Sequence, residues 1–88
     1  MELGQIVYSK AGRDSGKYYC VVEILGDDRV KIADGDLRRI KRAKIKNIKH
    51  LQSDGDILAK VAEKLKNGQQ VFDAELFSAL RFYNEKNQ

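Results

Sequence analysis

Cations and glycines are the residues of this chain whose spacing could support chemistry, and that chemistry is the binding of phosphate groups. Two apolar runs, Ile6 to Tyr8 and Tyr18 to Leu25, flank residues 10–17, which we call the first loop. The loop carries Gly12 and Gly16, which permit close approach of another backbone, and the cations Lys10, Arg13 and Lys17. Backbone amides and positive charge presented together suit a phosphate backbone. The alternative is an ordinary turn with solvated charges.

A second set of cations lies within residues 38–49, which we call the basic run. It holds seven cations and no acid in twelve residues: Arg38, Arg39, Lys41, Arg42, Lys44, Lys46 and Lys49. Like charges repel, so such a run favours an anionic partner that screens it. The favoured interpretation is a surface that lies on RNA phosphates. A solvated strand face and an amphipathic helix on an anionic membrane are alternatives, the membrane being disfavoured because no large apolar cluster adjoins the run.

Residues suited to catalysis or metal binding are sparse. His50 is the only histidine and has no cysteine nearby to complete a zinc site. Cys20 lies within a predicted strand, where a thiol is usually buried and inert. The segments Asp34-Gly35-Asp36 and Asp54-Gly55-Asp56 lack the other ligands of a calcium loop and are better explained by turn and cap chemistry. We therefore predict no enzymatic activity, no metal and no cofactor.

The positive charge is concentrated in the first part of the chain. The 88 residues carry a formal net charge of +4, which favours an anionic partner. Residues 1–52 hold 12 Lys or Arg against 7 Asp or Glu, and residues 53–88 hold 5 against 6, so their net charges are +5 and −1. The length suits one small domain, and one cysteine cannot form an internal disulfide. With neither a signal-peptide pattern nor a membrane-spanning run, we expect a cytoplasmic protein.

The elements that would position these residues begin with short strands. Residues 5–9 and 18–25 have the composition of strands, and residues 29–33 alternate polar and apolar side chains after a turn signal, which predicts a hairpin. Residues 18–25 carry apolar side chains on both faces, so this strand should be partly covered on both sides. We place two further strands near residues 38–42 and 46–51. Five strands in about 50 residues with short turns indicate an SH3-like barrel.

From residue 53 the pattern is helical. Ser53 or Asp54 is expected to cap a helix that stops at Asn67-Gly68, and Asp73 is expected to cap a second helix. Each helix is too short to be stable alone, so their apolar faces should pack on each other, on the barrel or on a second copy of the chain. The predicted architecture is mostly β with an α appendage: a five-stranded SH3-like barrel over residues 1–52, followed by two short helices in residues 53–88.

The first loop and its flanking strands, from Gly4 to Ile24, resemble the KOW motif. With the later segment Ile32-Ala33-Asp34-Gly35-Asp36 and a basic stretch ending at His50-Leu51, the order is similar to the large-subunit ribosomal protein fourteen-e family of archaea and eukaryotes, and to small bacterial KOW proteins. The resemblance covers a little over half of the chain and implies an SH3-like barrel that contacts structured, ribosomal RNA. The positions that match the family loop are Ser9, Lys10, Gly12, Arg13 and Lys17. The basic run resembles the basic stretch of the family in its positive charge but does not match it position by position.

These observations together predict a non-catalytic RNA-binding protein that docks on phosphates through the first loop and the basic run. One of Tyr8, Tyr18 and Tyr19 could also stack on an exposed base, unless these rings belong to the barrel core. The expected partner is RNA, with no membrane involved. The alternative function is a protein-interaction module that docks on transcription or ribosome-associated partners, with residues 53–88 as the partner face.

Overall fold

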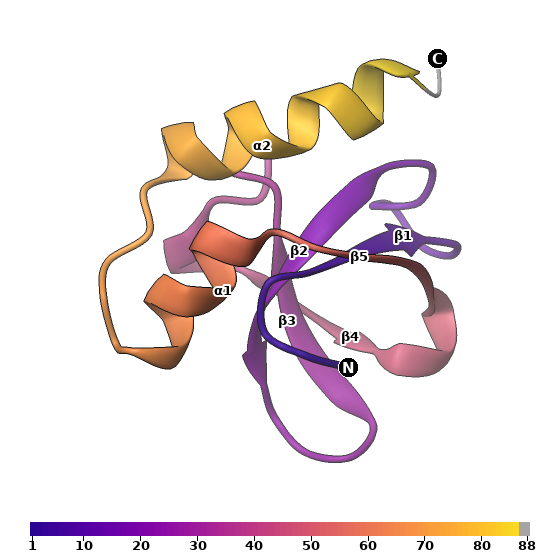
Figure 1. Ribbon diagram of the computed structural model, residues 1–88. Coiled ribbons are helices and arrows are strands. Elements are labelled where there is room, and N and C mark those ends of the chain that lie inside the picture. The colour runs from indigo at the N-terminus through magenta and orange to yellow at the C-terminus, as the bar shows by residue number, and fades with distance from the viewer. Residues whose placement is uncertain (87–88) are drawn as a thin grey trace.

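A five-stranded antiparallel sheet, curled into a half-barrel, forms the centre of the computed structural model, which describes residues 1–86 (Figure 1). Its strands lie in the spatial order β4-β3-β2-β1-β5, and their bounds are β1 (Gln5–Ser9), β2 (Tyr18–Ile24), β3 (Arg29–Ala33), β4 (Lys44–Asn47) and β5 (Leu51–Ile57). The helices are η1 (Ile40–Arg42) and η2 (Ile48–His50), both 3-10, and the α-helices α1 (Ala59–Lys66) and α2 (Asp73–Lys86). The mostly β architecture with two C-terminal helices is therefore confirmed.

The sheet has an apolar core on each of its faces. The residues buried inside the curl are Val7, Tyr19, Val21, Val30, Ile32 and Leu51. The residues buried between the other face and the helices are Ile6, Cys20, Ala33, Val61, Val71, Leu76 and Leu80. Successive residues of a strand point to opposite faces, so Tyr19 and Cys20 of β2 enter different cores. This confirms that the second predicted strand is partly covered on both sides, since Glu23 and Ile24 at its end are exposed.

Burial of Cys20 has a chemical consequence. The residue is fully buried, and burial raises the pKa of its thiol to about 12. A thiol with this pKa stays protonated at neutral pH, and the thiolate is the reactive form of cysteine. Cys20 is therefore a packing residue, as its position within a strand indicated.

Both α-helices pack on the sheet, which decides between the arrangements that the sequence left open. The approach is close enough that glycine is needed at two contacts. A Cβ atom at Gly4 would lie 2.5 Å from the Cβ of Ala62 in α1. A Cβ atom at Gly35 would collide with the carbonyl oxygen of Asp73, the first residue of α2. The helices thus lie directly against the backbone just outside β1 and β3.

Residues 38–42 are not the predicted strand. The carbonyl of Arg38 accepts hydrogen bonds from the backbone N–H groups of Asp34 and Gly35, at 2.9 and 3.1 Å, so the chain folds back immediately after β3. The following residues form η1. Strand β4 pairs with β3 only from Lys44 onward, and the strand predicted near residues 46–51 divides into the end of β4, η2 and the start of β5.

The first α-helix begins later than predicted, because β5 continues to Ile57. This strand therefore includes residues on both sides of the predicted boundary between the barrel (1–52) and the helical part (53–88). A step of two residues along β1, from Gln5 to Val7, matches a step of four along β5, from Ile57 to Ser53. Within this bulge the Ser53 hydroxyl accepts a hydrogen bond from Gly55 N–H at 3.1 Å. The residue expected to cap a helix instead stabilises a strand bulge, and α1 begins at Ala59 without a side-chain cap.

Leu76→Ala tests whether the helices share the core of the sheet. Leu76 is fully buried, and truncating a buried leucine costs about 2–5 kcal/mol of unfolding free energy because a cavity remains. We expect urea denaturation to show one transition at a lower midpoint. Leu37→Ala is the matched control, because Leu37 is 79% exposed and its loss should change this free energy by less than about 0.5 kcal/mol. Separate melting of helices and sheet would contradict a shared core.

Candidate nucleic-acid interface

The first loop is closed at its base by continued strand pairing. Ser9 N–H donates to the Lys17 carbonyl at 3.0 Å, and Gly16 N–H donates to the Ser9 carbonyl at 2.9 Å. Gly12 and Gly16 have φ angles of 83° and 86°, a region that residues with a Cβ atom rarely adopt, so the loop needs glycine at both positions. The Ser9 side chain is fully buried and its hydroxyl donates to the Ala11 carbonyl at 3.3 Å. Ser9 therefore shapes the loop from inside the protein.

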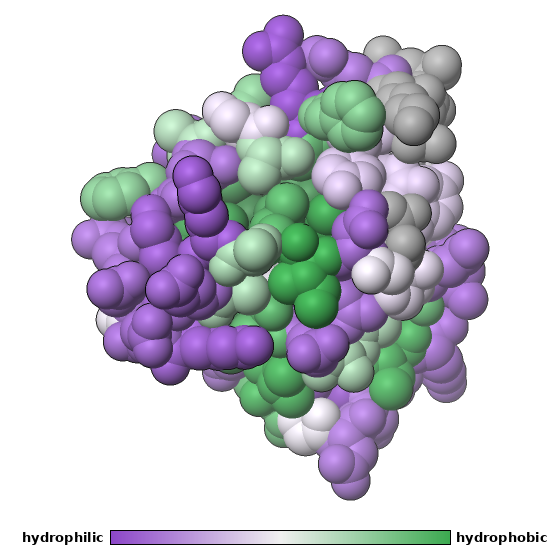
Figure 2. Space-filling model, viewed as in Figure 1, coloured by the Kyte–Doolittle hydropathy of each residue, from purple (hydrophilic) through white to green (hydrophobic). Residues whose placement is uncertain are grey.

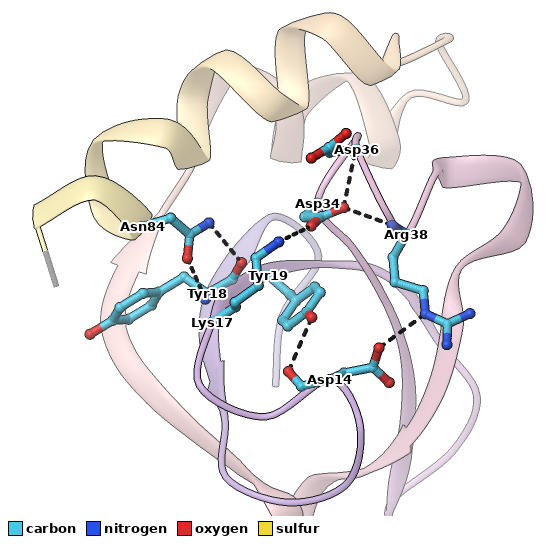
Figure 3. Close-up of polar contacts among 8 residues, drawn as sticks. All are labelled: Asp14, Lys17, Tyr18, Tyr19, Asp34, Asp36, Arg38 and Asn84. Atoms are coloured by element: carbon cyan, nitrogen blue, oxygen red, sulfur yellow. Dashed lines mark hydrogen bonds and ion pairs between the residues drawn. The ribbon is translucent and has the colours of Figure 1, made fainter. Parts of the chain in front are cut away.

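The buried carboxylate of Asp34 joins the first loop to the basic run (Figure 3). Its side chain is 3% exposed, and Lys17 Nζ lies 2.9 Å from Oδ2. The backbone N–H groups of Asp36 and Arg38 each donate to Oδ1 at 2.9 Å. Burial opposes ionisation of Asp34, but these three donors outweigh it and hold the pKa of the carboxyl below its ordinary value of 3.8. The ionised group thus fixes Lys17 and the start of the basic run together.

Arg38 is also bound directly to the first loop. Its Nε lies 3.1 Å from Oδ1 of Asp14, and in Figure 3 the two terminal nitrogens of the guanidinium point away from that carboxylate. The backbone of Asp14 is held in turn, because the Tyr19 hydroxyl donates to its carbonyl at 3.0 Å. Burial, and then the carboxylates of Asp14 and Asp34, raise the pKa of Tyr19 to about 12, so this hydroxyl keeps its proton. Asp14 therefore orients Arg38 with its outer nitrogens directed away from the loop, where they can meet a phosphate.

The far end of the basic run contacts the first loop as well. Lys46 of β4 is only 9% exposed, and its Nζ donates to the Ala11 carbonyl at 2.7 Å. The backbone N–H of Lys10 donates to the His50 carbonyl at 2.9 Å. The first loop is thus held at both ends of the basic run, and Lys46 acts as a link within the protein.

The candidate RNA-binding cations separate into two groups. Lys17, Arg38 and Lys46 have acceptors within the protein, and each leaves less than half of its side chain or residue exposed. The exposed candidates are Lys10, Arg13, Arg39, Lys41, Arg42, Lys44 and Lys49. The first group positions the backbone that carries the second. The structure brings the loop and the run into contact, and each carries exposed cations.

Two acids that hold this arrangement, Asp14 and Asp34, were not among the predicted site residues. Asp34 had a signal in the sequence, because it opens the turn Asp34-Gly35-Asp36 and an Asp in that position often accepts backbone N–H groups two and more residues later. Asp14 had no comparable signal. Its partner Arg38 lies 24 residues along the chain, and only the fold brings them together.

The tyrosines beside the first loop are engaged within the protein. Tyr19 is buried, while Tyr8 and Tyr18 pack edge to face with ring centres 5.1 Å apart. Asn84 of α2 accepts a hydrogen bond from Tyr18 N–H at 2.8 Å and donates to the Tyr18 carbonyl at 3.3 Å (Figure 3). Pairing of β2 with β3 has already ended at Cys20, so Asn84 takes the place of a missing strand partner. This contact ties α2 to the exit of the loop.

Asp34→Asn should destabilise the protein in a pH-dependent way. A carboxyl whose pKa is lowered by folding stabilises the fold above its unfolded pKa, and that contribution is lost as the pH falls through the folded value. An amide cannot pair with the Lys17 ammonium, so we expect a loss of about 1–3 kcal/mol at pH 7. The difference from the unsubstituted protein should shrink below about pH 4, where Asp34 of the unfolded chain begins to take up a proton and the contribution of the folded carboxylate declines.

Urea denaturation at pH 7 and pH 3 measures this difference. Asp36→Asn is the matched control, because Asp36 lies in the same turn with an exposed side chain. It should follow the unsubstituted protein at both pH values. A deficit of Asp34→Asn that is equal at the two pH values would contradict the role assigned to the ionised carboxylate.

Within residues 1–86 no group of three or more His, Cys, Asp or Glu side chains is placed to hold a metal ion. In the same part of the chain no helix combines the length and apolar composition needed to cross a membrane. No protein-family model matches the sequence, and no curated protein matches it either.

Proposed function

We propose that this is a cytoplasmic, non-catalytic RNA-binding protein, that its half-barrel is the SH3-like barrel of the KOW type, and that its partner is structured, ribosomal RNA. The strand order supports the barrel assignment, because β5 returns to pair with β1 and only η2 separates the edge strands β4 and β5 along the chain. The first loop with its two left-handed glycines supports the KOW assignment.

The observation that carries the proposal is the bonding of the first loop to the basic run. Arg38 contacts Asp14, Lys46 contacts Ala11, and the His50 carbonyl contacts Lys10 N–H. These bonds bring two segments that are far apart in sequence into contact, and both segments carry exposed cations. A duplex or folded RNA presents phosphates at regular spacing, and a rigid group of cations can neutralise several of them at once.

Binding by this surface is mainly electrostatic. Each exposed Lys or Arg that neutralises a phosphate releases a condensed counterion, which makes the affinity strongly dependent on salt. Asp14 and Asp34 fix the backbone and the guanidinium of Arg38 before RNA arrives, so less conformational freedom is lost on binding. Phosphate contacts position an RNA without reading its sequence, and this surface should therefore recognise shape more than base order.

Charge reversal in the first loop tests the proposal with an RNA hairpin as the probe. If about five phosphates are neutralised, the affinity of the unsubstituted protein should fall roughly a hundredfold between 50 and 200 mM salt. The double variant Lys10→Glu, Arg13→Glu should bind more weakly and with a shallower salt slope, by about 2 or more. Lys17 is unsuitable for this test, because reversing its charge would place two carboxylates beside each other at Asp34.

Lys60→Glu is the matched control for charge reversal, since Lys60 is exposed on α1. It should retain most of the affinity and the full salt slope. Binding that is independent of salt, or equal for the loop variant and the control, would contradict electrostatic docking through the first loop.

An apolar surface on the C-terminal part favours a second candidate, a protein-interaction module. Figure 2 shows an apolar area in the middle of the viewed face, bordered by hydrophilic side chains, where α1 and β5 lie in Figure 1. Ile57 is partly exposed and lines a shallow hollow of about 510 Å³ with Ala59 and Ala62. Such a surface suits an apolar patch on a protein partner.

RNase treatment of a pull-down distinguishes the two candidates. If RNA binding is the main function, RNase should release the proteins that co-purify with the chain, because they are held through a shared RNA. Ala59→Glu, which would place a charge in the hollow lined by Ile57 and Ala62, serves as the second arm, because Ala59 is exposed. Retention of partners after RNase, together with their loss in a folded Ala59→Glu protein, would favour protein docking.

A further inference from the structure

A second hollow lies on another part of the surface, where η1, the end of α1 and the linker between the α-helices meet. It has a volume of about 310 Å³, and we call it the linker groove. Ile40, Leu65 and Val71 provide apolar walls, and Phe72 stands at its side with 59% of its surface exposed. A large exposed aromatic ring beside an apolar hollow forms a contiguous apolar surface, and such surfaces mark binding sites.

The groove is held open by hydrogen bonds rather than by loose side chains. The carboxylate of Asp73 accepts a hydrogen bond from Ile40 N–H at 2.8 Å, which fixes η1 against the start of α2. The backbone N–H of Phe72 donates to Glu75 at 3.1 Å, and Glu75 is paired with Lys64 of α1 at 2.9 Å. The backbone on both sides of the groove is thus fixed, while the Phe72 ring remains exposed. A rigid backbone that presents an exposed ring is suited to stacking at low entropic cost.

Charge decides which occupant fits. Lys41 and Asp73 both line the groove. One carboxylate oxygen of Asp73 is engaged by Ile40 N–H, and the neighbours of Lys41 in the basic run, Arg39 and Arg42, are exposed. Gln69 and Gln70 add amide groups that can both donate and accept hydrogen bonds. The occupant should therefore combine a flat apolar ring with polar edges and an adjacent negative charge. An unpaired nucleotide has all three features, whereas a purely apolar peptide would leave Lys41 and the glutamines unused.

We propose that the linker groove binds an unpaired nucleobase of RNA, stacked on Phe72, while Lys41 contacts the phosphate next to it. This inference rests on the proposed RNA-binding function and extends it from phosphate contact to base contact. Lys41 lies three positions after Arg38, which is at most about 11 Å along the chain. A single-stranded segment that leaves a helix held by the first loop and Arg38 can therefore reach the groove within a few nucleotides.

Tryptophan fluorescence provides a direct test, because the chain contains no tryptophan. In Phe72→Trp the new indole would be the sole tryptophan, and a stacked base should quench its emission when hexa-adenylate is added. An abasic ribose-phosphate strand of the same length should not quench it. Phe82→Trp is the matched control, since Phe82 is 64% exposed and lies on α2 outside the groove. Equal quenching of both variants, or none in Phe72→Trp, would overturn the base site.

Affinity measurements separate failure of this inference from failure of the proposed function. Phe72→Ala should weaken binding of hexa-adenylate about tenfold, as expected for the loss of one stacked base, and should leave the affinity for an RNA duplex and its salt slope unchanged. Phe82→Ala should change neither. Unchanged hexa-adenylate binding by Phe72→Ala overturns the base site while duplex binding still supports the proposed function. If the unsubstituted protein binds neither RNA, both are overturned.

Discussion

One buried carboxylate holds together the parts of the molecule that carry its positive charge. Asp34 accepts hydrogen bonds from the two N–H groups that shape the turn after β3 and from the ammonium of Lys17 at the exit of the first loop. A buried carboxylate without such donors would be strongly unfavourable, so the turn, the loop and the charge stabilise one another. Because the basic run begins inside this turn, the direction in which the run leaves the sheet depends on the same group.

The candidate RNA-binding cations fall into two groups with different tasks, and the distinction matters for the proposed RNA binding. Lys17, Arg38 and Lys46 make contacts inside the protein and set the relative positions of strands and loop. Their exposed neighbours are left without such a role. Replacing a cation from the first group changes the shape of the surface, whereas replacing one from the second changes only its charge. A mutational scan that treats all basic residues alike would therefore mix loss of structure with loss of binding.

Local sequence patterns predicted the strands and turns correctly where contacts between nearby residues determine the structure. They failed where contacts with residues far away in the sequence determine it. The hairpin after Ile24 and the helix stop at Asn67-Gly68 follow from residues within a few positions of each other. Ser53 has the chemistry of a helix cap, but pairing with β1 made it part of a strand bulge. The sequence alone was enough to find the candidate cations. It could not predict the burial of Lys46 or the Asp14–Arg38 pair, because both depend on contacts between residues 24 or more positions apart.

The contact of Gly35 with the backbone of α2 has a consequence for how sequences of this kind can diverge. Position 35 has no room for a side chain because the carbonyl of Asp73 and the N–H of Phe77 occupy that space. Any replacement must displace α2, and with it the covering of one face of the sheet. Gly35 lies between two charged residues of the turn, so its conservation among relatives could be mistaken for a sign of ligand contact. The packing of α2 would explain such conservation instead. Substitution patterns around residue 35 should be interpreted with that packing requirement in mind.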